Sequence, residues 1–353
     1  MHEENVGTMP VQDTHRFDEA ALAHWMSAHV AGYRGELVVE QFKGGQSNPT
    51  FALTAGGERY VLRRKPPGKL LPSAHAVDRE YRVITALRDT GVPVAKTYAL
   101  CEDDSVIGTA FYIMAYVPGR VLWDPSLPGM TRDERAAIFD ELNRVIALLH
   151  KVDYQGIGLG DYGRPGSYLE RQIARWSKQY RASETERIEA MERLIEWLPH
   201  NIPPGDETAL VHGDYRLDNV MFHPTEPRIV AVLDWELSTL GHPIADFSYH
   251  CMTWRLTSAE FRGMHGFDFA GLGIPDEAEY VATYCRRTGR TAIPNWDFYA
   301  AYNMFRLAGI LQGIMGRVVA GTASSAHAIQ QGKRARPMAE AGWRQVENIL
   351  RKA

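Results

Sequence analysis

Two short polar motifs beside apolar runs constrain this chain more than any other part of its sequence. The first is H-G-D-x-x-x-x-N at residues 212–219, and the second is D-W-E at residues 234–236. Asp214 supplies a carboxylate that can accept a proton, and Asn219 and Asp234 supply oxygen atoms that suit a hard cation such as Mg²⁺. Gly and Asp also favour turns, so only the spacing of the whole set favours a chemical role.

The spacing of these motifs predicts a β-hairpin that brings their polar residues together. Two short apolar runs flank residues 223–228, which are rich in turn formers. The expected register places Asn219 opposite Val232, with Asp234 on the same face because side chains alternate along a strand. As diagonal neighbours, Asn219 and Asp234 would lie about 7–8 Å apart. Phosphoryl transfer from a magnesium nucleotide needs such groups.

The composition indicates an ordinary globular enzyme. The chain has 353 residues, a net charge of −4, 45% hydrophobic and 23% charged residues, which suits one large domain or two lobes and gives no sign of nucleic-acid binding. Its three cysteines show no C-x-x-C pair, so we expect neither a disulfide framework nor a zinc site. The polar start and the shortness of the apolar run at 110–117 predict a cytoplasmic protein without a membrane partner. The oligomeric state stays open.

Hydrophobic periodicity predicts a β-rich part followed by a helical part. Pro118 and Gly119 punctuate the chain after the strongest predicted strand, and Thr131 with Glu134 forms a capping box that opens a helix. We therefore expect a flexible N-terminus at 1–16, a β-rich lobe at 17–117 and a helical lobe at 118–353. The elements expected in the β-rich part are strands at 37–42, 51–53, 60–62, 94–101 and 111–117, and helices at 17–29 and 76–88.

This arrangement of motifs and elements resembles the aminoglycoside phosphotransferase and choline kinase family. The residues at 42–48 (F-K-G-G-Q-S-N) and 62–68 (L-R-R-K-P-P-G) are most similar to the kinase-like domains found joined to acyl-CoA dehydrogenases. The resemblance runs from about residue 36 to the C-terminus. It implies an α+β, protein-kinase-like fold with two lobes, a small antiparallel β lobe and a larger helical lobe. It also implies a kinase of small molecules that depends on Mg²⁺ and on ATP or another nucleoside triphosphate.

The resemblance assigns roles to the motif residues. Asp214 matches the catalytic aspartate, which serves as a base or orients the acceptor hydroxyl. Asn219 and Asp234 match the metal ligands. His212 is expected to organise the catalytic loop by hydrogen bonding, and Asp246 matches an acid that braces this loop.

The resemblance also implies a nucleotide site in the β-rich part. A turn over the phosphates would contain Gly44, Gly45 and Ser47, although a plain hairpin turn fits these residues almost equally well. The predicted hinge residues, whose backbone groups would meet the adenine, are Met114, Tyr116 and Val117.

Strand alternation adds two residues to this nucleotide site. Val61 and Arg63 share one face of their strand, so Val61 could line the adenine pocket while Arg63 reaches the phosphates. Glu80 on the next helix is the expected partner of Arg63, and the alternative is a surface cation beside a solvated glutamate. The wider protein-kinase-like fold usually has lysine in place of Arg63, and arginine is not equivalent to it. Glu236 could touch a second metal ion, touch the acceptor or hold the loop.

The late part of the chain suggests which acceptor is phosphorylated. Residues 298–337 contain no Asp or Glu but include Arg306, Arg317, Lys333, Arg334 and Arg336. A polycationic aminoglycoside needs acidic walls, whereas a partly basic wall suits a hydroxy acid or a hydroxyacyl-CoA. The alternatives are solvated cations on a helix face, an aminoglycoside- or choline-type kinase, and a nucleotide-binding pseudoenzyme that acts through protein partners.

Overall fold

The protein divides into two compact units, here called unit 1 and unit 2. The computed structural model describes residues 7–43, 48–66, 76–322 and 327–352. Unit 1 comprises Met1–Trp123, Gln155–Leu159 and Asp218–Ser238, and unit 2 comprises Asp124–Tyr154, Gly160–Leu217 and Thr239–Ala353. Unit 1 therefore continues past the predicted boundary at 117/118 and includes the motif hairpin, which the sequence places in the helical lobe.

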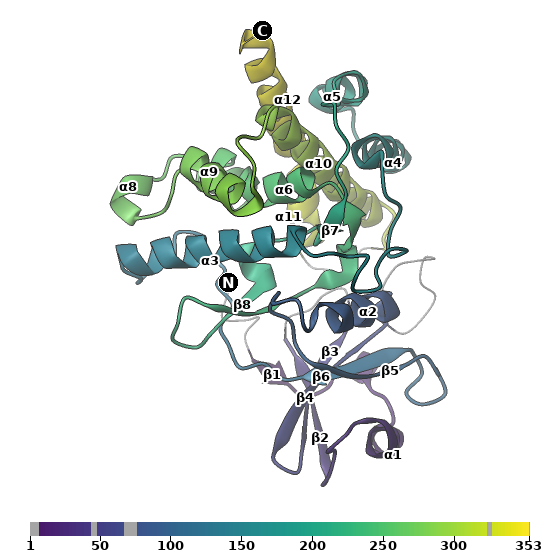
Figure 1. Ribbon diagram of the computed structural model, residues 1–353. Helices are drawn as coiled ribbons and strands as arrows, with labels where there is room; N and C mark the ends of the chain where they lie inside the picture. Colours follow the sequence, from purple (N-terminus) through teal and green to yellow (C-terminus); the bar gives the residue numbers. More distant parts are fainter. Residues whose placement is uncertain (1–6, 44–47, 67–75, 323–326, 353) are drawn as a thin grey trace. The chain divides into compact units, whose positions relative to one another are not determined.

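Unit 1 is built on a six-stranded antiparallel sheet with the order β1-β2-β3-β4-β6-β5 (Figure 1). All five predicted strands form, with ends that differ from the predicted ones by a few residues. Thr8 and Met9, from the segment expected to be flexible, pair with Phe42 and Gln41. The strands are β1 (Thr8–Met9), β2 (Leu37–Phe42), β3 (Thr50–Ala55), β4 (Glu58–Arg64), β5 (Thr97–Cys101) and β6 (Phe111–Ala115).

Strand alternation gives the sheet of unit 1 two different faces. Tyr60 and Leu62 of β4 join an apolar cluster with Leu22 and Met26 of helix α1 (Glu19–His29). The side chains between them therefore point to the other face. That face carries Arg63 of β4, whose guanidinium meets Glu80 on helix α2 (Val77–Leu87).

The motif hairpin packs within unit 1 and contains a β-bulge. It consists of β8 (Val220–Phe222) and β9 (Ile229–Val232). Val220 pairs with Val232, and the register shifts before Phe222 pairs with Ile229. The expected pairing of Asn219 with Val232 is therefore wrong, because the bulge inserts one extra residue into β9. Asn219 instead ends a 3-10 turn (Leu217–Asn219), and its carbonyl accepts the N–H of Leu233 at 2.8 Å.

Backbone hydrogen bonds explain why the hairpin belongs to unit 1. The N–H of Val232 donates to the carbonyl of Pro93 at 2.8 Å. Arg120 and Phe222 exchange two backbone hydrogen bonds of 2.8 and 2.9 Å. Strand pairing of this kind links segments that are far apart in the sequence, so hydrophobic periodicity alone cannot reveal it.

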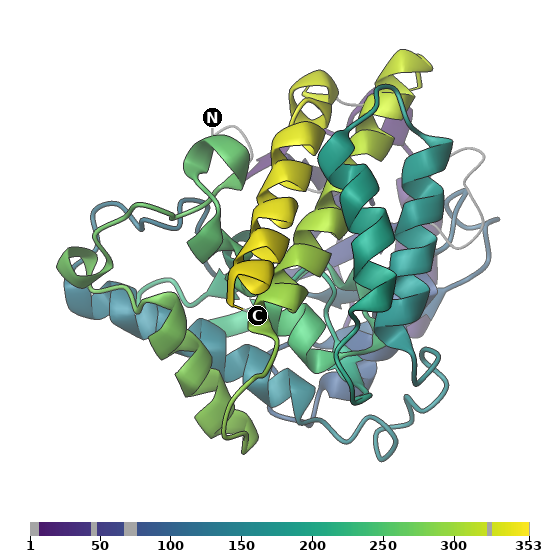
Figure 2. The same cartoon turned by 90° about the horizontal axis from the view of Figure 1, so that it is seen from above.

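Unit 2 is mainly helical. Its two short strands, β7 (Ala209–Val211) and β10 (Thr239–Gly241), pair antiparallel. Helix α6 is almost entirely buried, and α10 and α12 lie side by side (Figure 2). In the described residues no helix is both long and apolar enough to cross a bilayer. The helices are α3 (Arg132–His150), α4 (Tyr168–Ala182), α5 (Glu189–His200), α6 (Pro243–Arg255), α7 (Ser258–Phe261), α8 (Phe269–Leu272), α9 (Glu277–Thr288), α10 (Trp296–Val319), α11 (Ala328–Gly332) and α12 (Ala335–Lys352).

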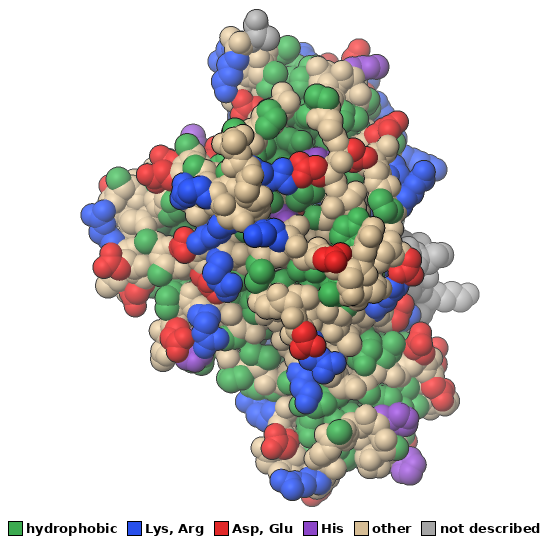
Figure 3. All heavy atoms as spheres, viewed as in Figure 1, with side chains coloured by type: hydrophobic (Ala, Val, Ile, Leu, Met, Phe, Trp, Pro, Cys, Tyr) green, Lys and Arg blue, Asp and Glu red, His purple; other side chains and the backbone are tan. Residues whose placement is uncertain are grey.

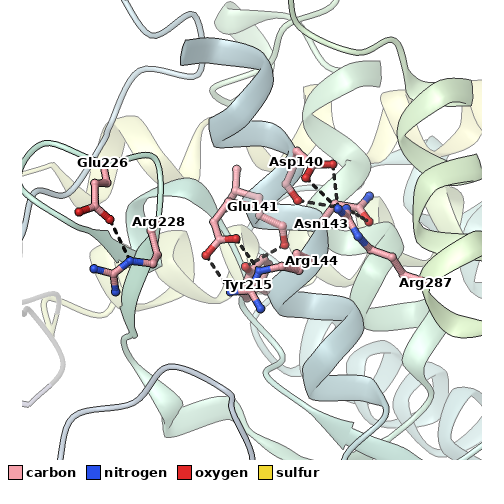
Figure 4. Close-up of polar contacts among 9 residues, drawn as sticks. Asp140, Glu141, Asn143, Arg144, Tyr215, Glu226, Arg228 and Arg287 are labelled. Atoms are coloured by element: carbon pink, nitrogen blue, oxygen red, sulfur yellow. Dashed lines mark hydrogen bonds and ion pairs between the residues drawn. The ribbon is translucent and has the colours of Figure 1, made fainter. Parts of the chain in front are cut away.

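Two features hold α3 in place within unit 2. The predicted capping box is present, because the Thr131 hydroxyl accepts the N–H of Glu134 while the Glu134 carboxylate accepts the N–H of Thr131. Arg287 of α9 donates to both carboxylate oxygens of Asp140 at 2.8 Å and to Asn143 at 3.0 Å (Figure 4). Charges of both signs are interspersed on the face drawn in Figure 3, in keeping with the small net charge.

Candidate active site

The loop that carries Asp214 follows β7, and the buried carboxylate of Asp246 holds its backbone by hydrogen bonds. Oδ2 of Asp246 accepts the N–H of His212 and Oδ1 accepts the N–H of Gly213, both at 2.8 Å. Gly213 has a φ of +83°, a left-handed conformation that glycine adopts without strain. The ring of His212 is buried, and its Nδ1 accepts the N–H of Asp214 at 3.2 Å. This hydrogen bonding fixes the backbone just before and at Asp214.

Asp246 is stabilised as an anion although it is buried. Burial alone would raise its pKa, but His150 and the N–H group of His212 outweigh this effect and lower the pKa below its ordinary value. Nε2 of His150 lies 3.1 Å from the carboxylate, and Nδ1 of the same ring lies 2.7 Å from the Tyr284 hydroxyl. The loop is therefore tied through Asp246 to helices α3 and α9.

The carboxylate of Asp214 is partly exposed and has polar partners within unit 2. The Tyr249 hydroxyl donates to its Oδ1 at 2.5 Å, and Nε of Arg216 lies 3.1 Å from the same oxygen. The side chain is 19% exposed, so the carboxylate can still meet solvent or a bound molecule. Arg306 of α10 donates to the carbonyl of Gly213 at 2.8 Å. Such a carboxylate can accept a proton from a hydroxyl group.

A second polar cluster lies in unit 1 around Arg63. Its Nη2 donates to Oδ1 of Asp234 at 2.7 Å, and its Nε lies 2.8 Å from Oε2 of Glu80. The contact with Glu80 is an ion pair without the alignment of a hydrogen bond. Burial alone would lower the pKa of Arg63, but Glu80 and Asp234 raise it above its ordinary value. Arg63 is thus a permanent cation shared by two carboxylates.

Glu80 differs from Asp246 because its pKa is raised, with burial as the largest cause. Burial and the charge of Asp234 raise the pKa of Glu80, although Arg63 and two hydrogen bonds oppose the rise. These hydrogen bonds come from Nδ2 of Asn48 at 2.7 Å and from the hydroxyl of Tyr112 at 3.2 Å. They orient Glu80 toward Arg63.

The predicted metal ligands both belong to unit 1. Asn219 is buried at the end of its 3-10 turn, and Asp234 has a φ of +60°, which is uncommon outside glycine. The ring of Trp235 anchors the backbone there, because its Nε1 donates to the carbonyl of Val232 at 2.9 Å. Glu236 lies in the following turn (Trp235–Leu237), and its charge contributes to the raised pKa of Arg63.

The donor set of these residues fits a hard cation. A carboxylate and an amide oxygen are the ligands that Mg²⁺ accepts, and two protein ligands are enough because Mg²⁺ keeps water and phosphate oxygens. No cluster of three or more His, Cys, Asp or Glu side chains that could form an all-protein site exists in the described ranges.

The remaining residues of the predicted nucleotide site lie on β4 and β6, just after β6, or outside the described residues. Val61 pairs directly with Met114 across these strands, and Val61 is buried. Tyr116 and Val117 follow β6, and the N–H of Tyr116 donates to the carbonyl of Arg59 at 3.4 Å. The predicted phosphate turn, with Gly44, Gly45 and Ser47, lies outside the described residues.

Several residues of these clusters were missed by sequence reasoning. Tyr112 could have been found, because a β6 strand paired with β4 places it directly opposite Arg63. Tyr249 could also have been found, because it lies one helical turn after Asp246 and therefore on the same face of the helix. Asn48 and His150 come from distant segments without a local pattern. Arg306 was predicted in the wall of the acceptor site, and not as a donor to the carbonyl of Gly213.

Comparisons with known proteins agree with this geometry. A family model described as "Phosphotransferase enzyme family" matches residues 38–302. Acyl-CoA dehydrogenase family member 10 of Mus musculus is 48% identical over 339 residues, which cover 95% of this chain and 32% of that protein. The chain thus spans about a third of this relative, and it spans under half of the other curated relatives that it matches.

Two solved structures extend the comparison. A protein of Ralstonia eutropha, assigned by name to the aminoglycoside phosphotransferases, is 64% identical with a TM-score of 0.88, covering 94% of this chain and 99% of that one. A thermostable mutant of the aminoglycoside phosphotransferase APH(4)-Ia, in a ternary complex with ADP and hygromycin B, shares the fold. It is 16% identical with a TM-score of 0.59, covering 91% of this chain and 97% of that one.

These matches confirm the predicted fold class and the predicted family. The six-stranded antiparallel sheet and the helical remainder are those of an α+β, kinase-like protein. The relatives named after acyl-CoA dehydrogenases confirm the more specific resemblance drawn from residues 42–48 and 62–68. The family model covers most of the sequence, so the chain belongs to the phosphotransferase enzyme family.

Proposed function

We propose that the protein transfers the γ-phosphoryl group of ATP, with Mg²⁺, to a hydroxyl group of a small anionic acceptor such as a hydroxyacyl-CoA or a hydroxy acid. The observation that carries this proposal is the fixed position of Asp214, whose backbone is held by His212 and, through Gly213, by Asp246. The nucleotides bound by the relative APH(4)-Ia support ATP as the donor. Family membership supports the transfer itself.

In the proposed reaction, the carboxylate of Asp214 orients the acceptor hydroxyl and takes its proton. The acceptor oxygen then forms a bond to the γ-phosphorus as the bond to the β–γ bridging oxygen breaks, and ADP leaves with that electron pair. Arg63 supplies a fixed positive charge, and Asn219 and Asp234 would hold the metal ion. When bound, Mg²⁺ neutralises the negative charge that develops on the phosphate oxygens.

The cations of unit 2 that support an anionic acceptor are only in part the predicted ones. Of the five cations between residues 298 and 337, Arg306 is buried against the Gly213 carbonyl, and Arg336 pairs with Glu186. Only Arg317, Lys333 and Arg334 are left to form the basic wall that was predicted, and this wall is weaker than expected.

Helix α4 offers a second group of cations. Arg171, Arg175 and Lys178 follow one another at helical spacing on one face, and Arg175 and Lys178 are exposed. Within the described ranges, no carboxylate pairs with Arg175 or Lys178. The centroid of the Trp176 ring lies 5.6 Å from the guanidinium of Arg175 and 5.9 Å from that of Arg306. A phosphate-bearing acceptor suits this combination of aromatic and basic groups.

An acceptor screen tests the proposal. ADP release is measured with hydroxyacyl-CoAs, the matching free hydroxy acids, aminoglycosides and choline, each with wild type and with Asp214→Asn. We expect turnover with the anionic acceptors and a roughly 10²- to 10⁴-fold loss in the variant. Turnover of the cationic acceptors alone would contradict the choice of acceptor. Full activity of Asp214→Asn would contradict the role of Asp214.

A charge reversal on α4 tests the binding of a phosphate-bearing acceptor. Arg175→Glu should raise the KM for a hydroxyacyl-CoA several-fold but leave the KM for the free hydroxy acid unchanged, because of these two acceptors only the hydroxyacyl-CoA carries phosphates. The KM for ATP should also stay unchanged, because the residues proposed to bind the nucleotide belong to unit 1 and Arg175 belongs to unit 2. The matched control is Arg351→Glu, another exposed arginine, near the end of α12. Equal effects of both reversals would indicate general electrostatics rather than a specific site.

A further inference from the structure

Helix α6 holds the catalytic loop at two successive levels. Asp246 accepts the backbone N–H groups that precede Asp214, as described above. One helical turn later, Tyr249 donates a hydrogen bond of 2.5 Å to Oδ1 of Asp214. Residues three apart lie on the same face of a helix, so α6 fixes the loop backbone and the carboxylate from one surface.

The ring of Tyr249 is itself held by α10. The guanidinium of Arg306 lies 5.1 Å from the centroid of the Tyr249 ring and also donates to the carbonyl of Gly213. Tyr249 is only 6% exposed, and Arg306 is 7% exposed. Both side chains are therefore packed, and neither is a surface group that touches Asp214 by chance.

We propose that Tyr249 is a positioning residue that sets the orientation of the Asp214 carboxylate for acceptor activation. This inference rests on the proposed function and adds a residue that the family motifs do not contain. The end torsion of an aspartate is broad, so a carboxylate without a fixed partner samples many orientations. A donor on Oδ1 selects one orientation and thereby fixes where the acceptor hydroxyl must lie.

The chemistry of the pair requires the phenol to stay protonated. Burial raises the pKa of Tyr249, and the negative charge of Asp214 raises it further, while Arg216 and Arg306 oppose this. At neutral pH the phenol is thus a donor and the carboxylate an acceptor. The acceptor proton still goes to Asp214, and Tyr249 gives up no proton in the reaction.

The test is Tyr249→Phe, which removes the hydroxyl but keeps the ring beside Arg306. We expect kcat to fall roughly 10- to 100-fold because a misplaced reacting group loses much of its effective concentration, with the KM for ATP unchanged. The measured quantity is the rate of ADP release with the best acceptor of the screen. If no acceptor raises this rate above the rate of ATP hydrolysis by water, the hydrolysis rate is used instead. A purely structural role would not separate kcat from KM in this way.

Tyr302→Phe is the matched control. Tyr302 is also a buried tyrosine that interacts electrostatically with Arg306, but in the described part of the chain its hydroxyl makes no hydrogen bond to Asp214. We expect this variant to keep the kcat of wild type. Thermal unfolding of both variants establishes that they fold. Arg306→Lys is a second test, because it changes the group that packs against the Tyr249 ring, and we expect it to lower kcat by a smaller factor.

The outcomes separate this inference from the proposed function. If Asp214→Asn is inactive while Tyr249→Phe matches wild type or is faster, the positioning role is wrong and the function stands. If Tyr302→Phe loses as much kcat as Tyr249→Phe, the effect is one of general packing and the inference fails. If Asp214→Asn retains full turnover, the proposed function fails first.

Discussion

Two buried carboxylates, one in each unit, have pKa values that are shifted in opposite directions. Asp246 in unit 2 is 5% exposed and its pKa is lowered, whereas Glu80 in unit 1 is 1% exposed and its pKa is raised. Asp246 accepts two backbone N–H groups and faces His150. Glu80 accepts two side-chain donors and shares Arg63 with Asp234.

The difference teaches what each carboxylate does. Backbone N–H groups of a tight loop are rigid donors that favour the anion, so Asp246 and the catalytic loop stabilise each other. The cation beside Glu80 is divided between two acids, so Glu80 is less stabilised but Arg63 remains positively charged where phosphate is expected. Asp246 thus supports the fold, while Glu80 mainly orients a cation.

The largest expected effect is that of Asp246→Asn. The amide can replace one of the lost acceptors at most, and it leaves a loop N–H and His150 without the anion they face. We expect a loss of about 3–5 kcal/mol in the free energy of unfolding. Urea unfolding measures it, and a loss under 1 kcal/mol would break the contrast between the two carboxylates.

Glu80→Gln should cost less, about 1–3 kcal/mol. Glutamine retains an acceptor for Asn48, and Arg63 keeps its hydrogen bond to Asp234. The same urea experiment checks this, and turnover measured alongside should show a larger KM for ATP because Arg63 is less well oriented. A stability loss larger than that of Asp246→Asn would reverse our assignment of roles.

The pH dependence of stability should differ in sign between the two groups. The folded pKa of Asp246 is depressed, so its contribution is present above about pH 4 and is lost as the pH falls through the folded pKa. The folded pKa of Glu80 is raised, so its contribution is complete below about pH 4.3 and is lost as the pH rises through the folded pKa.

Unfolding of wild type, Asp246→Asn and Glu80→Gln between pH 3 and 6 measures both slopes, because the other acids cancel in the differences. On acidification, the advantage of wild type over Asp246→Asn should shrink. Relative to Glu80→Gln, wild type should gain stability. Parallel curves for all three proteins would show that neither pKa is shifted by folding.

The smallest effect is expected for Tyr112→Phe. Its hydroxyl donates to Glu80 over a long 3.2 Å, and Asn48 still donates to the other oxygen. We expect a loss of about 0.5–1 kcal/mol and a further rise in the pKa of Glu80, because a donor to the anion is removed. Urea unfolding at pH 5 and pH 7 checks this, and no change would assign the orientation of Glu80 to Asn48 and Arg63.

Much of the fold and several site contacts were predictable because they depend on local patterns. Strand alternation placed Val61 and Arg63 together and, with the following helix, predicted the Arg63–Glu80 ion pair. The capping box at Thr131 was predictable because all its atoms lie within four residues. The hairpin was predicted as an element, but its bulge was not, because a bulge depends on what the second strand packs against.

The sequence by itself determined the family of the protein and the candidates for the reacting groups. Motif spacing and side-chain periodicity are properties of neighbouring residues, and these selected Asp214, Asn219 and Asp234. Only the tertiary structure decided which partners tune them, namely Tyr249 on Asp214 and Arg63 on Asp234. Those contacts join residues 35 and 171 positions apart, and the packing that brings such distant segments together follows no local pattern.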